Sequence, residues 1–551
     1  MKTSDFIIEE LYKNGTTKIF GYIGGMVAHL VDSIYKNPNV EMINTITEQG
    51  AGFAAEGYAR ANGVFSVTIA TSGPGATNLI TPIANCYFDS TPVLFITGQV
   101  NTYEYRKYSN IRQNGFQETN IVDMVKPVTK YAKMITNVED IKYEIQKALY
   151  IMQSGRKGPV LLDIPMDIQR LEVNEKDLKA FSIPKETKNN INIEDVEKAV
   201  TTAQKPLVLV GNGISLANAR DELKIFLDKS ELPVVESLHG ISCVEDYKNN
   251  MGLIGTYGNR YGNLALTNCD VLLVLGSRLD IRQTGSDLSV FKNKKIIHVD
   301  IDENELKCDK IQKQIINSDI NLFLKKLNKI DLKPNIEEWI KRIEEWKNKY
   351  NDNSKHFSVA NKFLNKIFET AKENDIFAVD VGQNQMWAAQ SAKLKKGQKF
   401  MTSGGHGCMG FALPTGIGAS FINRCVVITG DGGMQMNIQE LEIIKRRNLP
   451  IKIIVMNNSN LGMVRTFQEL YFEGRTASTV WDYSAPDFEK IAKVYGIKSQ
   501  TIDINDNVNL TEIFSNNEPF LLNVKMDLKT EVEPRLLFGN PINKQYPPIE
   551  E

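Results

Sequence analysis

Residues 425–460 read CVVITGDGGMQMNIQELEIIKRRNLPIKIIVMNNSN. The two apolar runs in this stretch, 425–429 and 451–456, predict buried parallel strands, and the amphipathic pattern over 437–447 predicts the helix that connects them. A crossover of this kind returns the chain to the same edge of one sheet. The stretch therefore predicts a unit of a doubly wound α/β fold.

Polar residues follow both predicted strands. Asp431 comes soon after the first strand and Asn458 after the second, so we expect both side chains at the sheet edge where such folds bind ligands. A carboxylate, an amide oxygen and a nearby backbone carbonyl suit Mg²⁺ and leave room for diphosphate oxygens. Gly430-Asp431-Gly432 alone would be more typical of a turn. The strand context favours a metal site formed by Asp431, Asn458 and Asn460.

The length of 551 residues exceeds what one hydrophobic core needs and suggests about three domains. Strand and helix patterns alternate throughout, so we predict three doubly wound parallel-sheet domains of the α/β class. The expected divisions are domains at 1–170, 191–330 and 357–551, a lysine-rich linker at 171–190 and a surface connecting helix within 331–356. The tail after Lys529 is too irregular to predict as helix or strand.

Composition argues against several classes of protein. The net charge of −1 gives no footprint for nucleic acid, and no run of 18 apolar residues predicts a membrane span. The six cysteines form no CxxC pair, which argues against a zinc site or a disulfide framework and fits a cytoplasmic protein. No HExxH or GxSxG motif supports a zinc protease or a hydrolase.

The chain resembles the catalytic subunit family of acetolactate (acetohydroxyacid) synthase, which are thiamine diphosphate enzymes, over nearly its whole length. Residues 430–464 resemble the thiamine diphosphate motif. The other matching blocks are FGYIGG at 20–25, TEQGAGFAAEGYAR at 47–60, TSGPGATNL at 71–79, FQETNIV at 116–122, GRKGPVLLDIP at 155–165, GSRLDIRQTG at 276–285, DVGQNQMWAAQ at 380–390 and TSGGHGCMGFALPTGIGA at 402–419. The resemblance implies that 1–170 binds the cofactor pyrimidine, that 191–330 is a middle domain able to bind FAD, and that 357–551 binds diphosphate and Mg²⁺.

The resemblance implies a carboligase that decarboxylates pyruvate to a hydroxyethyl carbanion and transfers it to a 2-oxo acid. An alternative acceptor is a nucleotide-linked 4-keto sugar, because SNIRQNGFQETNIV at 109–122 also resembles enzymes that build branched sugars. A simple decarboxylase would carry an adjacent histidine pair, which this chain lacks, and a pyruvate oxidase would use the flavin for electron transfer. A non-catalytic binding or regulatory protein would be expected to lack the key carboxylate or a metal ligand.

The resemblance also assigns residues to the thiamine diphosphate site. Glu48 alone could be a helix-cap acid, but in the family the matching carboxylate hydrogen-bonds the aminopyrimidine ring. Asn384 replaces the usual histidine and Ile23 the usual proline. The catalytic residues implied are Glu48, Gly25, Gln117, Met409 and Gly407. The cofactor-binding residues implied are Gly382, Gln383, Asn384, Gly430, Asp431, Gly432, Gly433, Asn458, Gly462 and Met463.

A flavin site is expected in the middle domain. Gly211-Asn212-Gly213 is half of a dinucleotide fingerprint, with Leu216 where the third glycine would stand. The resemblance implies FAD in a structural role. The FAD-binding residues implied are Arg156, Gly211, Asn212, Gly213, Ser237, Leu238, Arg278, Asp300 and Ile301.

Two residues are assigned to the substrates, Arg282 and Phe467. Phe467 stands where the biosynthetic enzymes carry a tryptophan that favours 2-oxobutyrate, although a plain core aromatic would explain it equally well. The expected partners are small-molecule substrates and further copies of the chain in a homodimer or homotetramer. The need for a regulatory subunit stays open.

Overall fold

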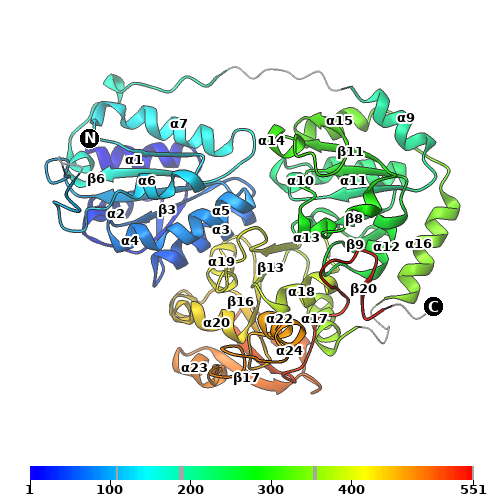
Figure 1. Cartoon of the computed structure of the whole chain (residues 1–551). Helices are drawn as coiled ribbons and strands as arrows, with labels where there is room; N and C mark the ends of the chain where they lie inside the picture. Colours follow the sequence, from blue (N-terminus) through cyan, green and yellow to red (C-terminus); the bar gives the residue numbers. More distant parts are fainter. Residues whose placement is uncertain (107–109, 185–191, 352–356, 549–551) are drawn as a thin grey trace.

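The computed structural model describes residues 1–106, 110–184, 192–351 and 357–548. Three six-stranded parallel sheets follow one another along the chain, each with helices packed around it (Figure 1). The predicted fold class, three doubly wound parallel-sheet domains, is confirmed. The proposed linker 171–190, connecting segment 331–356 and motif 109–122 lie partly outside the described residues, as does the end of the tail.

The first sheet has the order β2-β1-β3-β4-β6-β5. Its strands are β1 Lys18–Gly21, β2 Glu41–Asn44, β3 Ser66–Ala70, β4 Val93–Gln99, β5 Tyr131–Met134 and β6 Val160–Pro165. Its helices are α1 Thr3–Lys13, α2 Ala28–Lys36, α3 Glu48–Asn62, α4 Pro74–Asn78, α5 Ile80–Asp89, α6 Ile121–Val125, α7 Ile141–Gln153 and α8 Met166–Arg170. Thr47 caps α3, since its hydroxyl accepts a hydrogen bond from the Gly50 amide at 3.0 Å.

The third sheet has the order β14-β13-β15-β16-β18-β17, which is the topology of the first sheet repeated. Its strands are β13 Ile376–Val379, β14 Lys399–Thr402, β15 Cys425–Gly430, β16 Ile451–Asn457, β17 Lys498–Asp503 and β18 Phe520–Lys525. Its helices are α17 Val359–Thr370, α18 Gln383–Ser391, α19 Ala412–Ala419, α20 Asp431–Met436, α21 Leu441–Arg446, α22 Gly462–Tyr471, α23 Phe488–Val494 and α24 Leu510–Ile513.

The middle sheet has the order β12-β11-β10-β7-β8-β9, which is the strand order of dinucleotide-binding sheets. Its strands are β7 Pro206–Val210, β8 Val234–Glu236, β9 Asn250–Leu253, β10 Val271–Leu275, β11 Lys295–Asp300 and β12 Gln314–Asn317. Its helices are α9 Glu194–Thr202, α10 Gly213–Leu216, α11 Arg220–Ser230, α12 Arg260–Asn268, α13 Ile281–Thr284, α14 Glu303–Leu306 and α15 Ile320–Leu327, with α16 Glu337–Lys349 packed on it.

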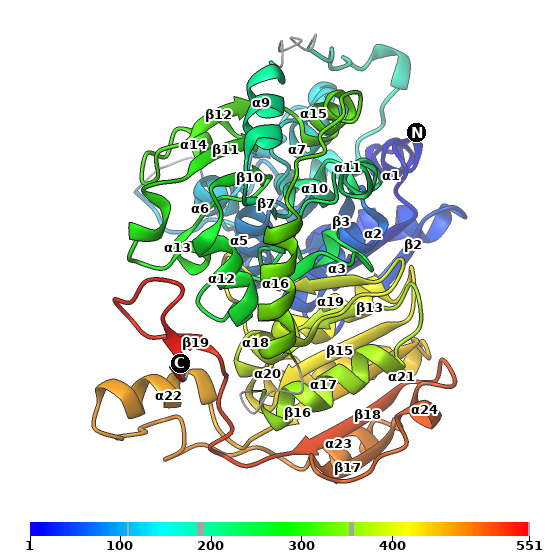
Figure 2. The same ribbon diagram turned by 90° about the vertical axis from the view of Figure 1, so that its right-hand side faces the viewer.

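The first and third domains meet through α3 and α19 (Figure 2). A Cβ added at Gly57 would lie 2.1 Å from the carbonyl oxygen of Thr415, and one at Gly418 would lie 1.8 Å from the carbonyl oxygen of Ala54. Only glycine allows backbones to approach this closely. Because the pairing runs in opposite directions along the two helices, the carboxyl end of α19 lies near the start of α3.

The structure refines three local expectations. The predicted helix 437–447 is interrupted, since α20 begins at Asp431 and a 3₁₀ turn, Ile438–Glu440, precedes α21. The helix α16 lies within the segment predicted as a connecting helix, and it buries Trp339 and Ile343 in the core of the middle domain. The tail contains regular structure, a short antiparallel pair of β19, Arg535–Leu536, and β20, Gln545–Tyr546.

Candidate active site

Three oxygen atoms converge where β15 and β16 end. The side-chain oxygen of Asn458 lies 3.3 Å from Asp431 Oδ1 and 3.1 Å from the backbone oxygen of Asn460, while its Nδ2 donates to Gln383 at 2.9 Å. Swapping the amides of Asn458 and Gln383 together would turn these approaches into hydrogen bonds. In the orientation described, a cation between the three oxygens would be held by the same atoms. The residues present therefore fit Mg²⁺.

The Asn460 side chain is turned away from this cluster. Its Nδ2 donates to the Asn458 carbonyl at 2.7 Å, and its Oδ1 accepts from Arg465 Nε at 3.2 Å. This leaves the backbone carbonyl of Asn460 as its ligand atom. Among the described residues no group of three or more His, Cys, Asp or Glu side chains could hold a metal ion, so amide and carbonyl oxygens must contribute here.

Asp431 is held by a residue that carries no sequence motif. Tyr483 donates a hydrogen bond to Asp431 Oδ2 at 2.8 Å. Burial raises the pKa of the Asp431 carboxyl to about 6, although the Tyr483 hydrogen bond favours the ionised form. A bound cation would favour that form further.

The proposed diphosphate loops surround the same edge. Gly462 leaves little room beside Gln383, because a Cβ there would lie 1.9 Å from the Gln383 oxygen. Asn384 is buried and donates to the Asp380 carbonyl at 2.8 Å. The positive φ of Gly382, 128°, permits the turn into α18. Met463 is partly buried against the domain core.

Met409 lies beside the Gly430–Gly433 turn. A Cβ at Gly432 would come within 3.1 Å of the Met409 methyl carbon and one at Gly433 within 2.9 Å of the Asp380 carboxyl. Asp380 in turn accepts from the amides of Gly410 at 3.0 Å and Ala412 at 3.1 Å. The loop that carries Gly407, whose φ is 75°, and Met409 is thus fixed against the start of α20, which carries Asp431.

The expected pyrimidine-side residues gather at the matching edge of the first sheet. A Cβ at Gly24 would lie 2.5 Å from Thr71, and one at Gly73 would lie 2.9 Å from Gln117. Gly25 begins a 3₁₀ turn with open space beside it, and Gln117 adopts a left-handed backbone with φ of 63°. The structure therefore brings these loops together.

Glu48 belongs to the same group. It is the first residue of α3, and its Oε2 accepts from Asn78 at 3.0 Å. A Cβ at Gly75 would lie 3.3 Å from Glu48 Oε1. The Glu48 side chain therefore lies at the ligand-binding edge of the first sheet.

Glu48 is distant along α3 from the loop of Gly407. Arg60 donates to the carbonyl of Thr402 at 2.9 Å, so the start of the loop packs on the carboxyl end of α3. Glu48 begins this helix, and twelve residues of α helix span about 18 Å. Within one chain, the start of this loop therefore lies about 18 Å along α3 from Glu48.

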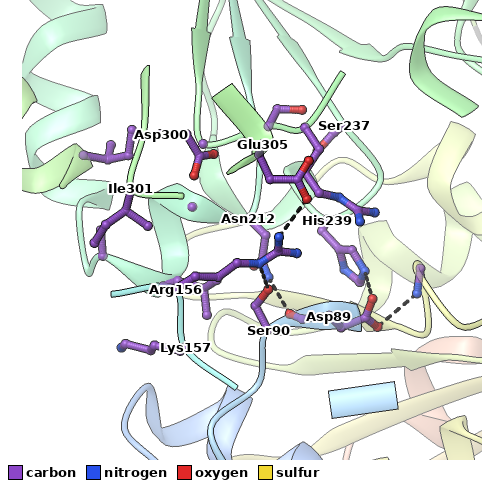
Figure 3. Close-up of a pocket in the computed structure, with 18 of the residues that line it drawn as sticks. Asp89, Ser90, Arg156, Lys157, Asn212, Ser237, His239, Asp300, Ile301 and Glu305 are labelled. Carbon is purple, nitrogen blue, oxygen red and sulfur yellow. Dashed lines mark hydrogen bonds and ion pairs between the residues drawn. The ribbon is translucent and has the colours of Figure 1, made fainter. Parts of the chain in front are cut away.

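A cavity of about 1460 Å³ lies between the middle domain and its neighbours (Figure 3). Most small-molecule sites have volumes of roughly 300–1,000 Å³, so a dinucleotide-sized ligand fits this one. The predicted FAD residues that line it are Arg156, Asn212, Gly213, Ser237, Leu238, Arg278, Asp300 and Ile301, together with Arg282.

Gly211 is not among the residues that line the cavity, but it lets two loops approach each other beside it. A Cβ there would lie 2.3 Å from the Gly276 oxygen, and the Gly213 amide donates to that oxygen at 3.0 Å. These glycines follow β7 and β10, the neighbouring strands where the strand order reverses. They let two loops touch at the crevice where such sheets bind ligands.

The arginines of the cavity have definite partners. Arg156 forms ion pairs with Asp302 at 3.1 Å and Glu305 at 2.7 Å. Arg278 lies 3.6 Å from Asp280. Arg282 reaches the third domain, where it donates to the Gly404 carbonyl at 3.5 Å.

Phe467 is not a core aromatic, since 52% of its surface is exposed on α22. Its ring centroid lies 4.7 Å from that of Tyr471 and 5.6 Å from that of Phe472. An exposed aromatic cluster of this kind is typical of a binding surface.

Family models match all three domains. They are described as the N-terminal TPP binding domain, the central domain and the C-terminal TPP binding domain of thiamine pyrophosphate (thiamine diphosphate) enzymes, over residues 1–124, 193–327 and 380–524. The acetolactate synthase large subunit of Lactococcus lactis subsp. lactis (strain IL1403) is 34% identical, covering 97% of this chain and 94% of the relative. The isozyme 2 large subunit of Escherichia coli (strain K12) is 35% identical over 97% of both chains, and the probable large subunit of Methanocaldococcus jannaschii is 36% identical over 96% of this chain and 92% of the relative.

The chain belongs to the acetolactate synthase large-subunit family. It is accordingly a thiamine-diphosphate-dependent enzyme of the carboligase type. No helix in the described part of this acetolactate synthase homologue is long and apolar enough to cross a membrane.

Several site residues of this acetolactate synthase homologue were missed from the sequence. Asp380 begins the DVGQ block, and its place directly after the apolar run 376–379 was the available signal. Tyr483, Asp89 and His239 belong to segments without a motif. The contact of Asp89 with His239 depends on how the domains pack, whereas Tyr483 reaches Asp431 within the third domain.

Proposed function

We propose that the chain joins a two-carbon unit from pyruvate to a second 2-oxo acid, with thiamine diphosphate and Mg²⁺. The observation that carries this proposal is the convergence of oxygens from Asp431, Asn458 and Asn460 at the ligand-binding edge of the third sheet. When bound, thiamine diphosphate supplies the nucleophilic carbon for decarboxylation and carbon–carbon bond formation.

The chain's own residues would bind and orient this cofactor. Asp431, Asn458 and the Asn460 carbonyl would hold Mg²⁺ against the diphosphate. Met409 would press against the cofactor beside Gly432, and the Gly407 carbonyl would accept from its amino group. The Glu48 carboxyl would share a proton with the pyrimidine ring nitrogen.

A second copy of the chain would complete the site. The loop that leads to Gly407 and Met409 starts about 18 Å along α3 from Glu48, and we propose that Glu48 of one copy serves Asp431 of its partner. Apolar side chains are exposed around both half-sites, as on an uncovered interface. They include Tyr22, Ile23 and Phe116 on the first domain and Val464, Phe467, Leu470 and Trp481 on the third. A two-fold dimer forms two such sites, and a homotetramer would pair two dimers.

FAD is proposed for the large cavity, in a structural role. The support is the strand order of the middle sheet, the cavity volume and the predicted residues that line the cavity. The glycine pair at Gly211 and Gly213 lies where the first strand of such a sheet meets its ligand.

The acceptor is proposed to be a 2-oxo acid. The relatives named above are acetolactate synthases, so a nucleotide-linked keto sugar is not favoured. Their designation as large subunits supports a separate regulatory subunit. A cytoplasmic location stays a prediction, supported by six cysteines without a disulfide.

The test is product analysis. Purified protein is incubated with pyruvate, Mg²⁺, thiamine diphosphate and FAD, alone and with a panel of 2-oxo acids and nucleotide keto sugars. Mass spectrometry should detect acetolactate from pyruvate alone. A branched sugar without acetolactate would replace the proposed acceptor, and acetaldehyde or acetate as the sole product would overturn the carboligase assignment.

A further inference from the structure

Asp89 lies at the point where all three domains meet. It ends α5 of the first domain, only 4% of its surface is exposed, and it borders the large cavity. Its carboxylate accepts from the amides of Gly404 at 3.1 Å and Gly405 at 2.8 Å in the third domain. The ring of His239 from the middle domain lies 3.1 Å from Asp89 Oδ1.

The residues around Asp89 are those expected to touch a cavity ligand. Arg156 donates to the Ser90 hydroxyl at 2.9 Å, and Asn212 donates to the Asp89 carbonyl at 3.3 Å (Figure 3). Figure 3 also shows the His239 ring directed at the Asp89 carboxylate. Arg156 thus contacts the residue after Asp89, and Asn212 contacts the Asp89 backbone. A ligand that binds both side chains would therefore restrain Asp89 through both contacts.

The two amides bound by Asp89 begin the loop that continues to Met409. The middle of this loop has a second anchor, because the Ser403 hydroxyl accepts from the amides of Gly407 and Cys408, both at 2.9 Å. Ser403 donates to Asn85, which donates to the buried carboxyl of Glu56 at 2.7 Å. The loop thus has two anchors. Asp89 belongs to the first domain, and Ser403 is itself bound to Asn85 of the first domain.

Asp89 is suited to hold backbone amides firmly. Burial opposes its ionisation, but His239 and Arg60 outweigh burial and lower the pKa of the Asp89 carboxyl to about 2. Hydrogen bonds to an ionised carboxylate are roughly twice as strong as neutral ones. The neutral amide of an asparagine could not replace them, because it has one acceptor oxygen instead of two.

We propose that Asp89 is a positioning residue that couples the occupancy of the large cavity to the order of the loop 404–409. This rests on the proposed function, in which the loop holds thiamine diphosphate and the cavity holds FAD. A flavin that orders Arg156, Asn212 and His239 would fix Asp89, and Asp89 would fix Gly404 and Gly405. The flavin would then raise thiamine diphosphate affinity without any electron transfer.

The coupling is measured by calorimetric titration of thiamine diphosphate in the presence of Mg²⁺, with and without FAD. We expect FAD to tighten thiamine diphosphate binding about 10-fold in the wild-type protein, within the usual range for coupled sites. Thiamine diphosphate should tighten FAD binding by the same factor. In Asp89→Asn the factor should fall to about 2 or less.

Asp270→Asn is the matched control. Asp270 accepts from two consecutive amides, Gln204 at 2.9 Å and Lys205 at 3.0 Å, in the same way as Asp89, but it precedes β10 outside the cavity lining. Asp270→Asn should keep the wild-type effect of FAD on thiamine diphosphate affinity. If Asp89→Asn also keeps this effect, or if Asp270→Asn loses it to the same extent, the proposal is overturned.

Hydrogen exchange on the wild-type protein tests the proposal without a variant. Adding FAD alone should slow exchange of the Gly404, Gly405, Gly407 and Cys408 amides by about 10-fold. Unchanged exchange would overturn the proposal even if Asp89→Asn fails to fold. If both cofactors bind but neither changes the affinity of the other, only the coupling proposal is overturned. If thiamine diphosphate does not bind at all, the proposed function is overturned as well.

Discussion

The first and third domains have the same strand order but very different ligand-binding edges. In the third, the residues after β15 and β16 direct three oxygens at one point. In the first, the corresponding edge carries the glycine loop at Gly25, the Thr71 turn and the carboxylate of Glu48. The shared topology places a crevice at the same position in both sheets, and the residues after the strands decide its chemistry.

The largest expected effect comes from removing the charged side chain at the ligand-binding edge of the third domain. Asp431→Ala should abolish Mg²⁺-dependent retention of thiamine diphosphate, with activity reduced by about 10³-fold or more, because the cation loses its only charged protein ligand. Gel filtration followed by cofactor analysis measures the retention. Asp487→Asn, an exposed aspartate that caps α23, is the control and should retain the cofactor. Full retention by Asp431→Ala would remove the metal assignment.

Removing the carboxylate of the first-domain edge should have a different result. Glu48→Gln should lower turnover about 10²-fold while the cofactor stays bound, because a proton-handling group contributes about this much. Steady-state kinetics and cofactor analysis measure the two effects. Glu139→Gln changes another acid at the start of a helix and should leave turnover unchanged. If the two variants behave alike, Glu48 is a helix-dipole acid only.

Mixing the two variants tests whether the two edges belong to one site across copies. A hybrid dimer of Glu48→Gln and Asp431→Ala keeps one intact site, and random mixing should restore about a quarter of wild-type activity. The activity of refolded mixtures, compared with each variant alone, measures this. No recovery in mixtures, or a fully active monomer in light scattering, would contradict the shared site.

The smallest expected effect concerns the acceptor. Wild-type protein given equal pyruvate and 2-oxobutyrate should show weak preference for 2-oxobutyrate, since Phe467 is smaller than tryptophan and lacks its indole donor. Phe467→Trp should raise the ratio of acetohydroxybutyrate to acetolactate about 10-fold, as expected for recognition of one methylene. Chromatography of the competing products measures the ratio. Phe472→Trp, on the neighbouring ring, should leave it unchanged, and a strong bias in the wild type would show that another residue selects the acceptor.

Much of the fold followed from local patterns. The strands β15 and β16 contain the predicted runs 425–429 and 451–456, and the polar residues that follow them lie close together, as expected for neighbouring strand ends. The helix predicted over 437–447 is helical only from α21 onward, because its first turn is a 3₁₀ turn. In that turn the Glu440 carboxylate accepts from the Ile46 amide at 3.1 Å and the Thr47 amide at 3.1 Å of the first domain. No periodicity within 437–447 contains that information.

The site residues that directly follow a strand could be predicted from the sequence. Asp431 and Asn458 could be paired because a crossover returns the chain to one edge. Asp89 and His239 could not, since they lie 150 positions apart in segments without a motif. Their 3.1 Å approach depends on how whole domains pack.

The contacts of the tail have a consequence for truncated forms of the chain. Glu531 binds the buried guanidinium of Arg465, which itself donates to Asn460, and Leu536 donates to the Thr256 carbonyl of the middle domain. Arg465 also forms an ion pair with Glu469 at 2.8 Å on α22. A chain that stops near residue 530 would keep the three sheets but lose one of the two carboxylates that hold Arg465. Such a chain would be folded in most of its mass, yet Asn460 at the edge of the third sheet would be less firmly supported.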